Sequence, residues 1–392
     1  MASIELFAGA GGLGMGMSKA GFHHVAVIEW DRDACATIRD NQKRGSGLVQ
    51  GWPIVRADIR DFSFCNLAGK IDVISGGPPC QPFSLGGKHK GYLDSRDMFP
   101  HAIRAVREIK PKAFILENVK GLTRATFINY VEYIKLQLSF PMVIKKPNEE
   151  WFDHLGRLER LRTKGRYHGL QYNVISRVLN AANFGVPQRR ERFFIAGFRT
   201  DLGIEWNFPD ETHSREALLW DQWVSGIYWE RHQLPKKRLP EPPKDISKIS
   251  RLPERPSAAA WLTVRDAIHD LPDPEREASS RSIPNHIFQS GARPYVGHTG
   301  SPLDEPAKTL KAGDHGVPGG ENMLLKPDDS VRYFTVRESA RLQTFPDDYV
   351  FTGSWTENMR QLGNAVPVRL AEVIATSIQE HLSASGTRVA SI

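Results

Sequence analysis

Cysteine is scarce in this sequence, and the few residues present are far apart. Cys35, Cys65 and Cys80 form no CxxC pair and are too few for a disulfide framework, which favours a reduced compartment. The thirteen histidines include neither an HExxH motif nor a Cys/His cluster, so no metal site is predicted. The adjacent His23 and His24 are expected in a surface turn.

Long apolar runs are missing as well. No stretch approaches the roughly 18 residues of a membrane span, and the start, MASIELFAGAGG, lacks the basic-then-apolar order of a signal peptide. We therefore expect a cytoplasmic protein without a membrane segment. The 392 residues, 40% hydrophobic and 25% charged, are ordinary for an enzyme of one or two globular domains.

Charge is the first feature that the chain has in excess. The formal net charge is +7, and residues 141–200 alone hold twelve Lys and Arg against five Asp and Glu. A concentrated basic segment is typical of a protein that binds a polyanion, but a solvated charged face would have the same composition.

The first two hundred residues alternate between short β-rich runs and helical patterns. Strands are predicted at residues 3–7, 24–31, 71–77, 113–119 and 193–198, and helices at 13–22 and 97–111. This alternation predicts an α/β protein with a doubly wound, Rossmann-like sheet.

The pattern changes after about residue 204. Residues 235–256 are rich in proline and charge and are predicted to be an irregular linker or insertion. A helix is predicted over 261–272, ended by proline, and residues 285–325 favour a small domain made mainly of loops. Helical periodicity returns at 335–345 and 367–382, where the chain is expected to pack again on the first domain.

Glycines follow the first predicted strand with the spacing Gly9-x-Gly11-x-x-Gly14, and Glu29 ends the next strand. In this fingerprint the glycines let the backbone approach a ligand, and the carboxylate accepts hydrogen bonds from ribose hydroxyls. The pattern serves NAD, FAD and S-adenosylmethionine alike, so it does not identify the cofactor.

Further reactive residues stand where other strands are expected to end. Because the carboxyl ends of strands in an open α/β sheet line the ligand crevice, four side chains are predicted to converge there: Glu29, Asp58, Cys80 and Glu117. Pro78 and Pro79 restrict the backbone before Cys80, which would hold its sulfur in one direction, as a nucleophile requires.

Arginines are concentrated just before the strand predicted at 193–198, in the segment QRRER. In an extended backbone Arg190 and Arg192 lie on one face, where they could meet a phosphate or a carbonyl oxygen. A solvated charged edge is the alternative.

Together these stretches resemble the ordered motifs of the DNA (cytosine-5)-methyltransferases of prokaryotic restriction-modification systems. The motifs are, in order, FAGAGGLG, Glu29-Trp30, Asp58-Ile59, PPCQ with Phe83 and Ser84, Glu117-Asn118-Val119, Gln188-x-Arg190-x-Arg192, RESARLQTFP and Gly363-Asn364-Ala365-Val366-Pro367. A lone glycine motif is weak, but PPCQ, ENV, QxRxR and GNxVP in this order are specific.

The resemblance implies a reaction and a catalytic set. A methyl group would pass from S-adenosylmethionine to carbon 5 of a cytosine flipped out of a specific double-stranded DNA sequence. Cys80 would add covalently to carbon 6, Glu117 would bond ring nitrogen 3 and the exocyclic amine, and Arg192 the carbonyl oxygen. Arg190 would contact a phosphate or the active-site loop.

The resemblance also implies binding residues. The cofactor would contact Phe7, Gly9, Gly11, Leu13, Glu29, Trp30, Asp58, Ile59, Pro79, Asn364 and Val366. DNA would contact Ser84, Lys88 and Arg96 in a mobile loop, and Arg293, Thr309, Leu310 and Lys311 in a target-recognition domain.

The same resemblance implies a division of the chain and a set of partners. The catalytic domain would comprise residues 1–202 and 331–392, and the variable region 203–330 would carry the target-recognition core, at about 275–330. Double-stranded DNA is the expected partner of a monomeric enzyme, and a cognate restriction endonuclease its functional counterpart.

Three alternatives differ in class. A tRNA cytosine-5 methyltransferase would share the motifs, but the long variable region disfavours it. A catalytically silent DNA-binding homologue would not need Cys80, Glu117 and Arg192. A nicotinamide oxidoreductase would leave PPCQ and QxRxR without a role.

Overall fold

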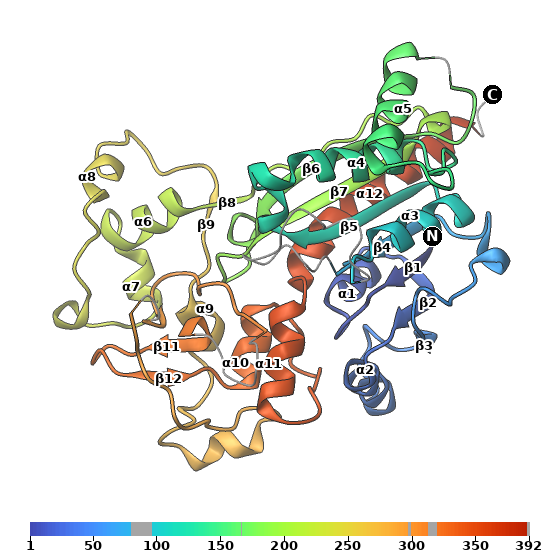
Figure 1. The fold of residues 1–392 in the computed structure, drawn as a ribbon. Coiled ribbons are helices and arrows are strands. Elements are labelled where there is room, and N and C mark those ends of the chain that lie inside the picture. The colour runs from blue at the N-terminus through green and yellow to red at the C-terminus, as the bar shows by residue number, and fades with distance from the viewer. Residues whose placement is uncertain (80–95, 166, 297–298, 313–319, 390–392) are drawn as a thin grey trace. The chain divides into compact units, whose positions relative to one another are not determined.

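The computed structural model describes residues 1–79, 96–165, 167–296, 299–312 and 320–389. The chain divides into two compact units (Figure 1). The first comprises Met1–Leu179, Glu191–Pro209 and Ala371–Ile392, and the second comprises Asn180–Arg190 and Asp210–Leu370. Each unit is thus assembled from segments that are distant in the sequence.

A seven-stranded sheet forms the centre of the first unit, in the order β3-β2-β1-β4-β5-β7-β6. Its strands are β1 (Ala2–Leu6), β2 (His23–Glu29), β3 (Ile54–Arg56), β4 (Val73–Gly76), β5 (Ala113–Val119), β6 (Tyr172–Asn180) and β7 (Glu191–Arg199). Strands β1 to β5 pair in parallel, and β7 is antiparallel to β5. The predicted doubly wound α/β sheet is therefore confirmed, and the antiparallel β7 makes it a mixed sheet.

Helices cover this sheet because alternate residues of its strands point to opposite faces. They are α1 (Gly12–Lys19), α2 (Arg32–Arg44), α3 (Phe99–Ile109), α4 (Ile128–Ser139) and the long α12 (Val368–Val389), while α5 (Trp151–Lys164) packs on α4. Ile4 and Leu6 of β1 share one core cluster with Ile103 of α3. Gly16 of α1 packs against α12 so closely that a Cβ there would lie 2.5 Å from the nitrogen of Glu372.

One histidine prediction is wrong. His24 is buried in β2 instead of lying in a surface turn. Its Nε2 donates to the carbonyl oxygen of Gly14, 3.0 Å away, and its Nδ1 lies 3.0 Å from Ser3 Oγ. Burial lowers its pKa to about 4, so the ring is neutral and links β2 to β1 and α1.

The second unit consists mostly of short elements. Its helices are α6 (Arg215–Trp223), α7 (Ile227–Arg231), α8 (Ile246–Ile249), α9 (Val264–Ile268), α10 (Val336–Leu342) and α11 (Trp355–Asn364). Its strands are β8 (His213–Ser214), β9 (Ala259–Ala260), β10 (Ser301–Pro302), β11 (Met323–Leu325) and β12 (Val331–Tyr333). Residues 235–256 are largely irregular apart from α8, as predicted.

The helix predicted over 261–272 is much shorter than expected. A capping box between Thr263 and Asp266 begins α9 at Val264. Trp261 lies outside the helix, where its backbone nitrogen donates to Ser214 and its indole to Asn183. Local capping and these contacts therefore outweigh the apolar spacing that favoured a longer helix.

Among the described residues, no helix has the length and hydropathy needed to cross a membrane.

Candidate active site

The carboxyl ends of the parallel strands lie along one edge of the sheet in the first unit. The glycine turn follows β1, Glu29 ends β2, Asp58 follows β3 and Pro79 follows β4. Glu117 is the third residue from the end of β5. In open α/β sheets this edge is where ligands bind.

The three glycines of the turn have different surroundings. Gly9 has a φ of +54°, and a Cβ placed there would have nothing within 4 Å. At Gly11 and Gly14 a Cβ would lie 3.0 and 2.9 Å from the indole of Trp52. Gly11 and Gly14 thus permit close packing on Trp52, whereas Gly9 leaves open space in which a ligand can approach the backbone.

Glu29 is buried and accepts hydrogen bonds from three backbone nitrogens. Oε2 accepts from Gly9, at 2.7 Å, and Oε1 accepts from Trp30 and Asp31, both at 2.8 Å. Burial raises the pKa of Glu29, while these donors oppose that shift. Trp30 as a whole is 69% exposed, so an accessible aromatic side chain stands beside a carboxylate that is fixed in position.

The other predicted cofactor residues of this unit differ in exposure. Asp58 lies in a loop and forms an ion pair with Arg60, whose hydrogen bonds lower the pKa of that carboxyl. The side chains of Leu13 and Ile59 are buried, and Phe7 is partly buried against the same core as Ile59. Contacts of Leu13 and Ile59 with a ligand would therefore fall mainly to their backbone groups.

Cys80 lies outside the described residues, as do Ser84 and Lys88. The structure describes the backbone up to Pro79, and two hydrogen bonds fix the residues just before Cys80. Asn118 Nδ2 donates to the carbonyl oxygen of Pro78, at 2.9 Å, and the nitrogen of Met98 donates to that of Pro79, at 3.1 Å. The sequence indicated no role for Asn118, whose contact ties β5 to the backbone that leads to Cys80.

Glu117 and Arg192 form an ion pair with both side chains largely buried. Arg192 Nε lies 2.9 Å from Glu117 Oε1. The pairing of β5 with β7 brings these side chains together, since Val119 is the register partner of Arg192 and Glu117 that of Phe194. A Cβ at Gly77 would lie 3.2 Å from Glu117 Oε2, so the carboxyl also adjoins the GGPP backbone. Burial lowers the pKa of Arg192, and Glu117 opposes this shift.

Arg190 lies in different surroundings from those expected. It precedes β7, belongs to the second unit and has no exposed surface. Its guanidinium donates to the carbonyl oxygens of Leu310, Gly363 and Ala365, at 2.9, 2.6 and 2.8 Å. A phosphate contact by Arg190 is therefore not supported, because its donors are directed at backbone carbonyls in the interior.

The candidate DNA-binding residues are only partly accessible. Arg96 and Arg293 are exposed. Thr309 Oγ1 donates to the carbonyl oxygen of Arg189, and Lys311 Nζ lies 2.7 Å from Glu321 Oε1. The side chain of Leu310 is fully buried, so a side-chain contact of Leu310 with DNA is contradicted.

Asn364 and Val366, the remaining predicted cofactor residues, lie in the second unit at the end of α11 and just after it. Asn364 is exposed and Val366 is buried.

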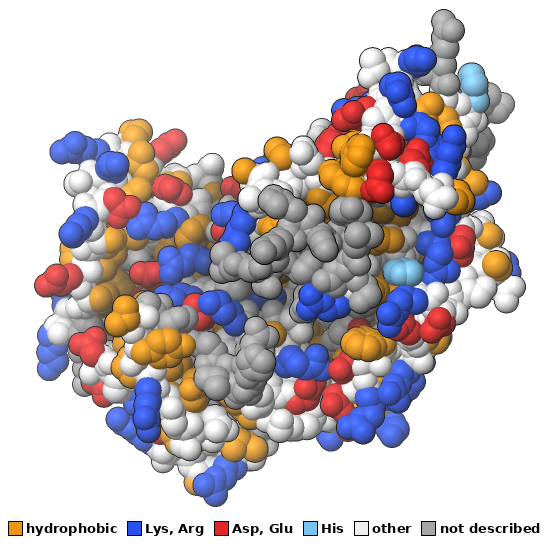
Figure 2. Space-filling model, in the orientation of Figure 1, with side chains coloured by type: hydrophobic (Ala, Val, Ile, Leu, Met, Phe, Trp, Pro, Cys, Tyr) orange, Lys and Arg blue, Asp and Glu red, His pale blue; other side chains and the backbone are white. Residues whose placement is uncertain are grey.

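The basic excess of residues 141–200 does not form one patch of free charges. Arg157 pairs with Glu149, Arg162 with Glu132, and Arg199 with Asp201, while Arg190 is buried and the side chain of Arg192 is largely buried against Glu117. Figure 2 shows Lys and Arg side chains interspersed with Asp and Glu side chains over the visible face.

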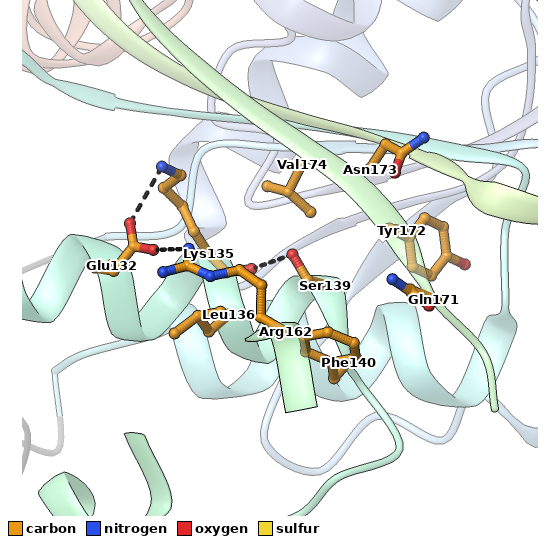
Figure 3. Close-up of a pocket in the computed structure, with 10 residues that line it drawn as sticks. All are labelled: Glu132, Lys135, Leu136, Ser139, Phe140, Arg162, Gln171, Tyr172, Asn173 and Val174. Carbon is orange, nitrogen blue, oxygen red and sulfur yellow. Dashed lines mark hydrogen bonds and ion pairs between the residues drawn. The ribbon is translucent and has the colours of Figure 1, made fainter. Parts of the chain in front are cut away.

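A separate pocket of about 220 Å³ lies between α4, α5 and the start of β6. Its lining includes the ion pairs of Glu132 with Lys135 and Arg162 (Figure 3). Gln171, also in the lining, accepts a hydrogen bond from the nitrogen of Thr200, just beyond the end of β7 opposite to Arg192. Thr200 is eight residues from Arg192 along the strand, so about 26 Å, at roughly 3.3 Å per residue, separate this end of the pocket from the Glu117–Arg192 pair.

No group of three or more His, Cys, Asp and Glu side chains in the described ranges is arranged to hold a metal ion.

Comparison with known proteins identifies the family. A family model for C-5 cytosine-specific DNA methylases matches residues 1–140 and 166–380, so the unmatched stretch between them contains the whole of α5. The chain is 32% identical over 385 residues to the Type II methyltransferase M.PspPI of Psychrobacter sp. (strain TA137), covering 97% of this chain and 80% of that protein. It is 32% identical over 380 residues to M.Eco47II of Escherichia coli, covering 96% and 78%.

Solved structures show the same fold. The S. pombe Dnmt2 methyltransferase matches with a TM-score of 0.56 and 17% sequence identity, over 98% of this chain and 99% of that one. Since the family model covers nearly the whole chain and its relatives are similar along most of their length, this chain belongs to the C-5 cytosine-specific DNA methylase family and is a DNA (cytosine-5-)-methyltransferase.

Proposed function

We propose that the chain transfers a methyl group from S-adenosylmethionine to carbon 5 of a cytosine flipped out of double-stranded DNA, by way of a covalent bond to Cys80. The observation that carries this proposal is the buried Glu117–Arg192 pair beside the GGPP backbone that leads to Cys80. It lies at the same sheet edge as the Gly9 turn and Glu29. A base and a methyl donor could therefore meet there.

The residues at this edge fit the proposed cofactor. Gly9 leaves room for close approach of a ligand, Glu29 is fixed where it could accept hydrogen bonds from ribose hydroxyls, and Trp30 offers an exposed ring for stacking. S-adenosylmethionine would supply an electrophilic methyl group. Asn364 and Val366 would complete the contacts, as the family resemblance implies.

The reaction follows from the weak nucleophilicity of carbon 5. The thiolate of Cys80 would form a bond from sulfur to carbon 6, and the displaced electron pair would make carbon 5 nucleophilic. Glu117, which must carry a proton for this contact, would donate a hydrogen bond to ring nitrogen 3 and accept one from the exocyclic amine. Arg192 would donate to the carbonyl oxygen, where negative charge develops. The new bond to carbon 5 would replace the bond between the methyl group and the sulfonium sulfur, so that S-adenosylhomocysteine is left as the second product. A base would then remove the carbon-5 proton, the ring double bond would reform, and the Cys80 sulfur would leave with its electron pair.

We further propose that the substrate is a specific duplex sequence and that methylation protects it from a cognate restriction endonuclease. Support comes from the relatives, which are named Type II methyltransferases. The fold likeness to a Dnmt2 methyltransferase does not distinguish the tRNA alternative, because at 17% identity it bears on the fold alone. A silent homologue is disfavoured by the retained Cys80, Glu117 and Arg192.

A labelling assay tests the proposal. The protein is incubated with methyl-labelled S-adenosylmethionine and either duplex DNA or tRNA. Label is expected on DNA, at carbon 5 of cytosine, with loss of at least about 1000-fold in Cys80→Ala, since removal of a covalent nucleophile has effects of this order. Cys65, an exposed free cysteine, provides the matched control, and Cys65→Ala should retain full activity.

Label on tRNA alone, or undiminished label in Cys80→Ala, would contradict the proposal. Bisulfite sequencing of DNA from cells that express the protein then identifies the methylated sequence.

A further inference from the structure

We propose that Arg190 is a positioning residue that couples cofactor binding to DNA binding, by joining the GNAVP segment to the recognition segment Thr309–Ala312. The inference rests on the proposed function, in which Asn364 and Val366 contact the cofactor, and on the predicted DNA contact of Lys311, the half-exposed residue of the recognition segment. All the residues that form the connection belong to the second unit.

The guanidinium of Arg190 bonds both segments at once. Nη1 donates to the carbonyl oxygen of Leu310 at 2.9 Å, and Nη2 donates to those of Gly363 and Ala365 at 2.6 and 2.8 Å. Arg190 has no exposed surface, so water cannot replace a lost partner. Because breaking a buried charged hydrogen bond is costly, each carbonyl is held firmly relative to the others.

The two segments are also in direct contact. A Cβ at Gly363 would lie 2.2 Å from the nitrogen of Ala312 and 2.4 Å from the carbonyl carbon of Lys311. Only a residue without a side chain fits there, so the backbone of the recognition segment rests on the first residue of GNAVP. A displacement of either backbone segment therefore requires a displacement of the other.

The recognition segment is tied on its other side as well. Gln188 Oε1 accepts from the nitrogen of Leu310 at 3.0 Å, and Thr309 Oγ1 donates to the carbonyl oxygen of Arg189 at 2.7 Å. Lys311 exchanges backbone hydrogen bonds with the side chain of Asn322, at 3.0 and 2.9 Å. The segment is thus a rigid element with a defined position, which is what transmission of a small shift requires.

Asn364 lies between the two carbonyls that Arg190 holds, and its own side chain is exposed. A cofactor that contacts Asn364 or Val366 favours one position of the Gly363 and Ala365 carbonyls. The planar fork of Arg190 then favours the corresponding position of Leu310. By linkage, DNA that stabilises this position of the recognition segment strengthens cofactor binding by the same factor.

The test measures that factor. The dissociation constant for a duplex that the wild-type enzyme methylates is determined without and with saturating S-adenosylhomocysteine. The wild type is expected to bind the duplex at least about 5-fold more tightly with the cofactor product, at the lower end of ordinary couplings. In Arg190→Lys, which keeps the charge but loses the fork, the ratio should fall to between 1 and 2, as expected of lost coupling.

Arg337 provides a matched control. It is also buried and donates to three carbonyl oxygens, those of Pro284, Pro346 and Tyr349, at 3.1, 3.3 and 3.0 Å. Arg337→Lys should lower the melting temperature to a similar extent and keep the wild-type ratio. A ratio that is unchanged in Arg190→Lys, or reduced equally in both variants, overturns the inference.

If Arg190→Lys does not fold, hydrogen exchange of the wild type provides the answer. S-adenosylhomocysteine should increase protection of the Leu310 and Lys311 amides, and unchanged protection overturns the inference. Failure of the proposed function is distinguishable, because it would appear as absent methyl transfer to DNA by the wild type. If the wild type methylates DNA but binds it equally tightly with and without S-adenosylhomocysteine, the coupling is refuted and the proposed function is not.

Discussion

Glu117 and Arg192 show how a single pair of side chains can prepare a site before any ligand binds. Both side chains are about nine-tenths buried, and the bond from Arg192 Nε to Glu117 Oε1 fixes the carboxyl against the backbone that leads to Cys80. In the proposed function, two groups held in this way would need no reorganisation on entry of a base, which is the condition under which electrostatic stabilisation is strongest.

Glu5 is a buried carboxyl with a measurable consequence for stability. It lies in β1, accepts a hydrogen bond from Ser75 of β4, and burial raises its pKa from an ordinary value of 4.5 to about 8. The folded state therefore keeps a proton that the unfolded state loses. The free energy of unfolding should fall as pH rises from about 4.5 to about 8, by up to about 1.4 kcal/mol per pH unit from this group.

Glu5→Gln removes the titrating group and should flatten this part of the pH profile. Urea unfolding at pH 5, 6, 7 and 8 measures the effect in both proteins. Parallel profiles for wild type and variant would show that Glu5 is ionised in the folded state.

At the scale of elements, substitution of Gly9 should have two effects, one from backbone strain in the turn and one from lost contact with the cofactor. Gly9→Ala places a side chain at a φ of +54° and into open space. The strain should cost about 1 to 2 kcal/mol of stability, and the methyl group should raise KM for S-adenosylmethionine about 10-fold, if contact worth about 1.4 kcal/mol is lost.

Gly21 is the matched control for Gly9, because it also has a positive φ, +86°, and nothing within 4 Å of a Cβ. Gly21→Ala should lower stability by a similar amount and leave KM unchanged. An equal rise of KM in both variants would show that Gly9 acts through the fold and not through contact with the cofactor.

The elements that were predicted correctly are those whose sequence signal is local. Strands β1, β2, β4, β5 and β7 are short β-rich runs that end in turns, and the rule for strand ends placed Glu29 and Glu117 at one edge. Arg190 could not be placed in this way, because its carbonyl partners lie 120 to 175 residues further along the chain. The surface turn expected at His24 was wrong because a buried imidazole with two partners behaves as a core residue.

At the scale of the whole molecule, net charge alone does not locate the DNA-binding surface. Some of the basic side chains of residues 141–200 form internal contacts, such as those of Arg190 with backbone carbonyls and of Arg192 with Glu117. Long-range attraction of DNA depends on the summed charge, but specific phosphate contacts need accessible cations at the right edge.

Arg162 tests this distinction. It lines the pocket at the end of the sheet opposite to Arg192 and is paired with Glu132, so a DNA phosphate does not contact it in the arrangement proposed above. Arg162→Gln should change the dissociation constant for duplex DNA less than about 2-fold and leave the slope of log K against log salt unchanged, because no counterion release is lost.

Lys88, predicted to contact phosphate, is the comparison. Lys88→Gln removes the same charge and should weaken binding and reduce the salt slope by about 1, as expected for one lost phosphate contact. Titrations of a labelled duplex at several salt concentrations measure both quantities. A salt slope that falls in Arg162→Gln and not in Lys88→Gln would place the DNA on the α5 end of the first unit, and would thereby contradict the active-site edge proposed here.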